Sequence, residues 1–159
     1  MLIEEMKNVF GDDQKRINHA LAVLDYAQQI QAVEGGDPLI VTAAAILHDI
    51  GIQQAQRKYN SAAGKYQEIE GPPIAREILS KYKLDGAAIE HICKIIANHH
   101  SARGIDTTEF RILWDADWLV NIPEEFPDIT IEKLQALIDK VFKTNKGRQI
   151  AIESFLQKI

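Results

Sequence analysis

Apolar residues recur along most of the chain at the three- and four-residue spacing of buried helix faces, and no segment shows the alternation typical of a strand. Aspartate, threonine or proline stands at most of the expected helix starts. The pattern therefore predicts an all-α fold, a compact bundle of about seven helices. The predicted helices run from Asp12 or Asp13 to about Glu34, from Asp37 to near Gly51, from Pro72 to about Tyr82, from Asp85 or Gly86 to His99 or His100, from Asp106 to just before Pro123, from Thr130 to about Lys143, and from about Asn145 to the end.

One polar segment interrupts this pattern. Residues 53–71 contain Gly64 and few apolar positions, so we expect a surface excursion or lid with at most a short helix. A chain of 159 residues suits one domain. Apolar residues in the last helices favour their packing on the bundle over a dimer surface, and both a monomer and a homodimer fit the sequence.

Several polar residues fall on the faces that the helices are expected to bury. Successive residues of a helix are rotated by about 100°, so these faces can be assigned from the sequence. His19 flanks the apolar face of the first long helix. The second helix is nearly apolar over residues 39–47 and then ends on His48 and Asp49. Polar groups that end a buried helix need a hydrogen-bond partner or a bound ligand.

Two later helices repeat this feature. His99 continues an isoleucine stripe, and His100 lies at the edge of the same stripe. In the helix that follows, Asp117 projects between apolar residues while Asp115 lies further round. If one of these two acids is buried, it should therefore be Asp117.

Each of these groups has an ordinary explanation when taken alone, as a core histidine, a helix-terminal pair or a structural salt bridge. Together they would need several separate partners, whereas one cation would satisfy two imidazoles and two carboxylates. Such a mixed nitrogen and oxygen set suits a divalent Mn, Fe, Co, Ni or Zn ion. His99 or His100 could then act as general acid or base, or hold a second metal.

Composition excludes several other functions. The 18 Lys and Arg are scattered among 23 Asp and Glu, with a net charge of −5, so no basic stripe is available to bind a nucleic-acid polymer. No apolar run approaches the roughly 20 residues that span a membrane, so we expect no membrane partner. The single cysteine, Cys93, fits a cytoplasmic protein. The sequence holds no His-Glu-x-x-His, Cys-x-x-Cys, Gly-x-Ser-x-Gly or phosphate-binding P-loop motif.

The arrangement of these residues strongly resembles the HD-domain superfamily of metal-dependent phosphohydrolases. The resemblance rests on His19, on the run AAILHDIG at residues 44–51 and on DADWL at residues 115–119, and it covers residues from about 13 to 121. It implies one HD domain over residues 1–159, with the C-terminal helices at 130–159 packed on the core that carries the motifs. It also implies metal ligation by His19, His48, Asp49 and Asp117.

The resemblance further implies hydrolysis of a phosphate ester of a small molecule, with a nucleotide favoured, by a metal-activated water. The expected catalytic residues are Asp49, His99 and His100, and the expected substrate-binding residues are Arg16, Lys65 and Arg103.

Two departures from the family pattern bear on the number of metals. Two-metal members carry a further histidine where this chain has Gln67, Glu68 and Glu70, and no Gly-Tyr-Pro follows His100. We therefore expect one metal per chain, with a second still allowed for. The alternatives are a metal-stabilised binding module without turnover and, less favoured, an HD-type di-iron oxygenase in which a glutamate replaces the histidine.

Overall fold

The computed structural model describes residues 1–157 and is helical throughout, with nine α-helices, one π-helical turn and no strand in that range. This confirms the predicted all-α class. The elements are α1 (Leu2–Phe10), α2 (Gln14–Glu34), α3 (Pro38–Leu47), α4 (Ile52–Tyr59), α5 (Gly64–Leu79), α6 (Gly86–Asn98), α7 (Thr108–Glu125), α8 (Ile131–Val141), α9 (Asn145–Ala151) and the turn η1 (Ile152–Leu156). The predicted continuation of the last helix to residue 159 lies outside the described residues.

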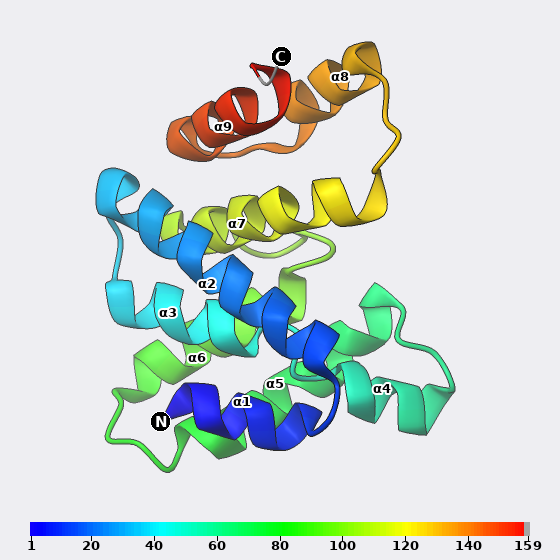
Figure 1. The fold of residues 1–159 in the computed structure, drawn as a ribbon. Coiled ribbons are helices and arrows are strands. Elements are labelled where there is room, and N and C mark those ends of the chain that lie inside the picture. The colour runs from blue at the N-terminus through cyan, green and yellow to red at the C-terminus, as the bar shows by residue number, and fades with distance from the viewer. Residues whose placement is uncertain (158–159) are drawn as a thin grey trace.

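The helices are arranged around a central group of three. Helix α2 packs against both α3 and α7, and α3 also contacts α6. Figure 1 shows α8 and α9 at one end of the molecule, and α1, α4 and α5 at the other. No helix in residues 1–157 is long and apolar enough to cross a membrane.

The structure holds two more helices than the sequence pattern predicts. Helix α1 begins the chain and buries Met6 and Phe10 on one face. The other addition lies in the segment 53–71, where the expected surface excursion is wrong. This segment forms α4 and the first half of α5, and Pro72 and Pro73 lie inside α5 rather than at its start.

Polar side chains tie α4 to α5 as an antiparallel pair. The rings of Tyr59 and Tyr66 stack with their centroids 4.2 Å apart. Glu70 accepts hydrogen bonds from the Tyr59 hydroxyl at 2.8 Å and from Lys58 at 3.3 Å. The turn between the helices begins at Asn60, which has a left-handed φ of 53°. The polar residues that suggested a loop are therefore the contacts that join these two helices.

The C-terminal part of the chain is anchored to α7 by Asp115. This fully buried carboxylate accepts hydrogen bonds from the backbone amides of Lys143 and Thr144, both at 2.8 Å, and from the Thr144 hydroxyl at 2.6 Å. The expectation that Asp117 rather than Asp115 would be buried is therefore wrong, because both are. Helix α7 is covered on one side by α2 and α3 and on another by α9, so it has more than one buried face.

A close backbone contact sets the position of the segment after His48 and Asp49. A Cβ added at Gly51 would lie 2.5 Å from the backbone nitrogen of Gly71 and 2.9 Å from the carbonyl oxygen of Gln67. Only glycine allows this approach, so the backbone at Gly51, just after His48 and Asp49, packs directly against α5.

We predict that Gly51→Ala destabilises the protein by about 1–3 kcal/mol, because backbone atoms cannot move aside as a flexible side chain would. Gly86→Ala is the matched control, since a Cβ at Gly86 meets nothing within 4 Å. Urea-induced unfolding of both variants measures the difference. Equal stability of the two would contradict the described contact.

Candidate metal centre

Four polar side chains from three parts of the chain meet near the centre of the bundle. His48 and Asp49 directly follow α3, a helix that is apolar and buried over its final turns. His19 comes from the first half of α2, and Asp117 from the middle of α7. All four are at least nine-tenths buried. The structure thus brings together the four residues that the family resemblance selected as ligands.

The donor atoms of this group lie close together. His19 Nε2 is 3.0 Å from Asp117 Oδ1, 3.3 Å from Asp49 Oδ2 and 3.3 Å from His48 Nε2. His48 Nε2 is also 3.3 Å from Asp49 Oδ2 and 3.4 Å from Asp117 Oδ1. Two imidazole nitrogens and two carboxylate oxygens therefore converge on one small volume.

Local hydrogen bonds aim two of the imidazoles inward. His48 Nδ1 donates to the carbonyl oxygen of Ala45 at 2.8 Å, and His99 Nδ1 donates to that of Ile96 at 2.6 Å. Both histidines lie one residue beyond a helix end. A carbonyl can only accept, so Nδ1 carries the proton in each ring and Nε2 is turned towards the centre.

These separations fit a metal ion. Ligand atoms about 2.1 Å from one ion lie about 3.0 Å apart at octahedral angles and about 3.4 Å apart at tetrahedral angles. The measured separations span 3.0 to 3.4 Å. In addition, His99 Nε2 is buried and has no hydrogen-bond partner among the described residues, although it lies 3.3 Å from Asp49 Oδ1. Imidazole and carboxylate together suit divalent transition metals.

The electrostatics of the group also favour a cation. Burial raises the pKa of Asp49, but the charges and hydrogen bonds of His48 and His99 together outweigh that effect, so the net pKa lies well below the ordinary value. Asp117 behaves in the same way, and its pKa is likewise depressed. Burial lowers the pKa of His48, and the two carboxylates outweigh that effect and raise it well above the ordinary value. Both carboxylates thus stay ionised and hold positive charge nearby.

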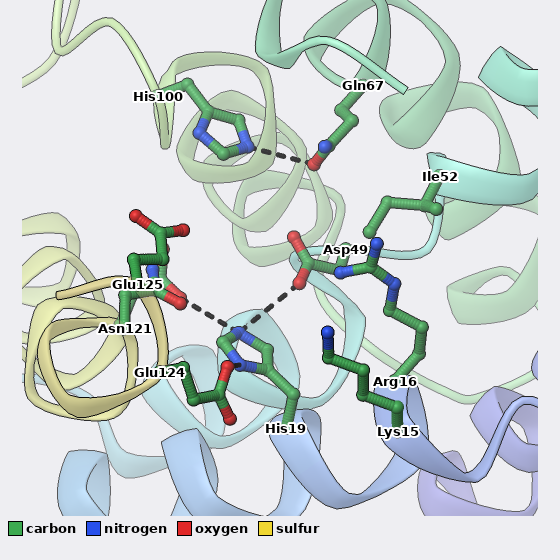
Figure 2. A pocket seen from close by; sticks show the side chains of 11 residues that line it. Lys15, Arg16, His19, Asp49, Ile52, Gln67, His100, Asn121, Glu124 and Glu125 are labelled. Atoms are coloured by element: carbon green, nitrogen blue, oxygen red, sulfur yellow. Dashed lines mark hydrogen bonds and ion pairs between the residues drawn. The ribbon is translucent and has the colours of Figure 1, made fainter. Parts of the chain in front are cut away.

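The group opens into a cavity of about 280 Å³. Figure 2 shows Lys15, Arg16 and His19 entering it from α2, and Asn121, Glu124 and Glu125 from α7. The remaining lining residues are Asp49, Ile52, Gln67, His100 and Asp117. Two cationic side chains therefore share the cavity with two carboxylates of the candidate centre.

The expected catalytic histidines occupy different positions. His100 lines the cavity, and its Nε2 lies 2.8 Å from Gln67 Oε1. Burial, followed by the neighbouring His99, lowers the pKa of His100 to about 4. His99 is buried behind Asp49 and does not line the cavity. Asp49, His99 and His100 form a second close group of donor atoms beside the first.

The expected substrate-binding residues separate in the structure. Arg16 lines the cavity, whereas Lys65 and Arg103 do not. Lys65 lies over the Tyr66 ring on α5, and Arg103 borders a different hollow beside Lys143. Both lie in segments whose spatial position the sequence pattern did not define.

Sequence reasoning missed the contribution of α7 to the cavity. The helix was expected to end before Pro123, but it continues through Pro123 to Glu125. Asn121 and Glu124 follow Asp117 by four and seven residues, so they share one face of α7 with it. Helical spacing from Asp117 could have identified Asn121, which lies inside the predicted helix, and it would also have identified Glu124 had the helix end been placed correctly.

The fold and the site define an all-helical protein with a buried histidine and aspartate centre. The HD domain family model matches residues 16–122 of the chain. The protein therefore belongs to the HD domain family, as the sequence resemblance indicated, and HD domains bind divalent metals.

A solved structure shares this fold. It is the crystal structure of a predicted HD superfamily hydrolase from an uncultured Thermotogales bacterium, which aligns with a TM-score of 0.72 at 22% sequence identity. The alignment covers 98% of this chain and 85% of that one. A comparison with curated proteins finds no match.

Asp115 and Asp117 form a matched pair for testing the centre, since they are buried on the same helix. We predict that Asp117→Asn lowers the metal content of the purified protein, because the centre loses a charged ligand. Asp115→Asn should keep the metal and lose about 1–3 kcal/mol of stability, because a backbone amide of Lys143 or Thr144 loses its acceptor. Elemental analysis and thermal unfolding of both variants measure these effects. Equal metal loss in the two variants would exclude a specific role for Asp117.

Metal affinity should rise with pH. The raised pKa of His48 keeps the metal-free imidazole protonated at neutral pH, whereas a ligating histidine is neutral, so binding must release this proton. The dissociation constant should therefore fall by up to about tenfold per pH unit while pH remains below that pKa. Chelator competition for Zn²⁺ at pH 6, 7 and 8 measures the dependence, and a constant affinity would show that no proton is displaced.

Proposed function

We propose that this protein is a metal-dependent phosphohydrolase that acts, as a single HD domain, on a phosphate ester of a small molecule, with a nucleotide as the favoured substrate. The observation that carries the proposal is the convergence of His19, His48, Asp49 and Asp117 at a cavity that also presents Arg16. A cluster of ligands needs an open side for chemistry, and here the cavity provides it.

A bound divalent cation would polarise a phosphoryl oxygen and make a coordinated water more acidic. The side chains of this chain would supply the rest. Arg16 would bind the phosphate, since a guanidinium can pair two phosphate oxygens at once, and Lys15 would add positive charge beside it. Asp49 would help to hold the metal beside the bound phosphate. His100, which lines the cavity, would act as general acid or base, giving a proton to the leaving oxygen or accepting one from the attacking water.

The size and polarity of the cavity support a small polar substrate. About 280 Å³ is near the lower end of the range for ligand pockets. Ile52 is the one apolar residue among those that line it. A compact phosphate ester suits this space better than an extended apolar molecule.

The positions of Glu68 and Glu70 favour the phosphohydrolase over a di-iron oxygenase. These are the acids that could replace the missing histidine as ligands of a second iron. Glu68 instead accepts hydrogen bonds from the backbone of His100 and from the backbone and hydroxyl of Ser101. Glu70 is bound by Lys58 and Tyr59. Asp49, His99 and His100 remain as donors for a second metal, and two irons per chain with redox-dependent spectra would support the oxygenase.

The proposal is tested by a screen of nucleoside monophosphates, sugar phosphates and other phosphomonoesters with added Mn²⁺. We expect phosphate release by the wild-type protein, and a loss of at least about a hundredfold in Asp117→Asn because the centre lacks a ligand. Thermal unfolding confirms that the variant is folded. A metal-loaded protein that turns over none of these compounds would favour the alternative of a metal-stabilised binding module.

Arg16 and Arg103 provide an internal comparison within the same assay. Arg16→Ala should raise KM and lower kcat/KM about tenfold or more, because Arg16 lines the cavity and would contact the phosphate. Arg103→Ala removes the same charge outside the cavity and should leave both constants nearly unchanged. If the two variants behave alike, Arg16 does not bind the substrate.

A further inference from the structure

Three histidines near the centre, His19, His48 and His99, differ in the partner of the ring nitrogen that faces away from the centre. His48 and His99 donate from Nδ1 to the carbonyl three residues before, at 2.8 and 2.6 Å. Those carbonyls lie in the last turns of α3 and α6, where the regular hydrogen bonds of the helix end. The Ile96 carbonyl also accepts a long bond of 3.5 Å from the His99 backbone amide. His19 has no such acceptor, since it lies inside α2, where the nearby carbonyls are bonded to amides of the next turn.

A carboxylate from another helix lies at the outward nitrogen of His19. Glu124 Oε2 is 3.7 Å from His19 Nδ1, on the side of the ring opposite Nε2 and the ligand group (Figure 2). This separation is long for a direct hydrogen bond, and one water or a rotation of the half-exposed glutamate would complete the contact. A buried imidazole that presents Nε2 to a metal needs an acceptor for its Nδ1 proton.

We propose that Glu124 is the positioning residue for His19. Its carboxylate accepts a hydrogen bond from Nδ1–H and so fixes the tautomer and the ring orientation that present Nε2 to the metal. This role rests on the metal centre of the proposed function. Helix α7 then supplies two elements of the site, since Asp117 and Glu124 are seven residues apart and lie on the same face. One is a ligand, and the other orients the ligand contributed by α2.

Glu125 provides a matched control. It lines the same cavity and carries the same charge, but it makes no ion pair with His19, and Figure 2 shows its carboxylate away from that ring. Removing either glutamate changes the charge at the cavity by the same amount. A difference between the two variants therefore reports the contact with Nδ1 and not the overall electrostatic field.

The test is the Zn²⁺ affinity of the full chain, measured by chelator competition at one pH. Glu124→Ala should weaken binding about tenfold or more, the effect typical of losing the partner of a ligating histidine. Glu125→Ala should change it less than about threefold. Glu124→Gln should give an intermediate value, because the amide oxygen still accepts a hydrogen bond but carries no charge. Equal affinities of Glu124→Ala and Glu125→Ala would overturn the assignment.

Two further measurements separate the ways in which the experiment can fail. Thermal unfolding without metal should be nearly the same for wild type and Glu124→Ala, so a large loss of stability in the variant would contradict a positioning role. NMR of the ¹⁵N-labelled, Zn²⁺-loaded protein should show a protonated His19 Nδ1 whose resonance shifts or broadens in Glu124→Ala and not in Glu125→Ala. A wild-type protein that binds no Zn²⁺ would refute the metal centre itself, whereas normal binding without turnover would refute only the hydrolase activity.

Discussion

The His48 imidazole and the Asp49 carboxylate leave the end of a buried helix in a region shielded from solvent, where their desolvation must be offset by close partners. The partners come from α2 and α7, the two helices that pack most extensively against each other and that each contribute one further polar group. Because the cost of burying a lone charge is large, the positions of these helices and the positions of the four side chains are linked. The packing of the helices and the composition of the centre therefore depend on each other.

The sequence was most informative where chemistry conflicts with hydrophobic pattern. His19, His48 and Asp117 could be identified because they occupy directions that apolar residues would normally fill. Helical spacing gave the long helices α2, α3, α6 and α7 in approximately their observed positions. The resemblance to the HD domain selected the four candidate ligands as one group, which periodicity within single helices does not provide.

The errors have a common physical cause, since local patterns do not show tertiary partners. The segment 53–71 is polar because its residues bond to each other and to His100 and Ser101, and not because it is a loop. The burial of Asp115 was not predicted because α7 is covered on two sides. Pro123 suggested a helix end, and it does remove one hydrogen bond of the helix, but α7 continues through it to Glu125 and brings Glu124 to the site.

The anchor at Asp115 also bears on how far this domain is modular. The family match ends at residue 122, yet the three donors that satisfy Asp115 belong to residues 143 and 144. A fragment cut to the family boundary would leave that carboxylate without these partners, only two residues from Asp117. The contacts that support the centre therefore extend beyond the segment that the family model matches, into the C-terminal residues that supply the donors to Asp115.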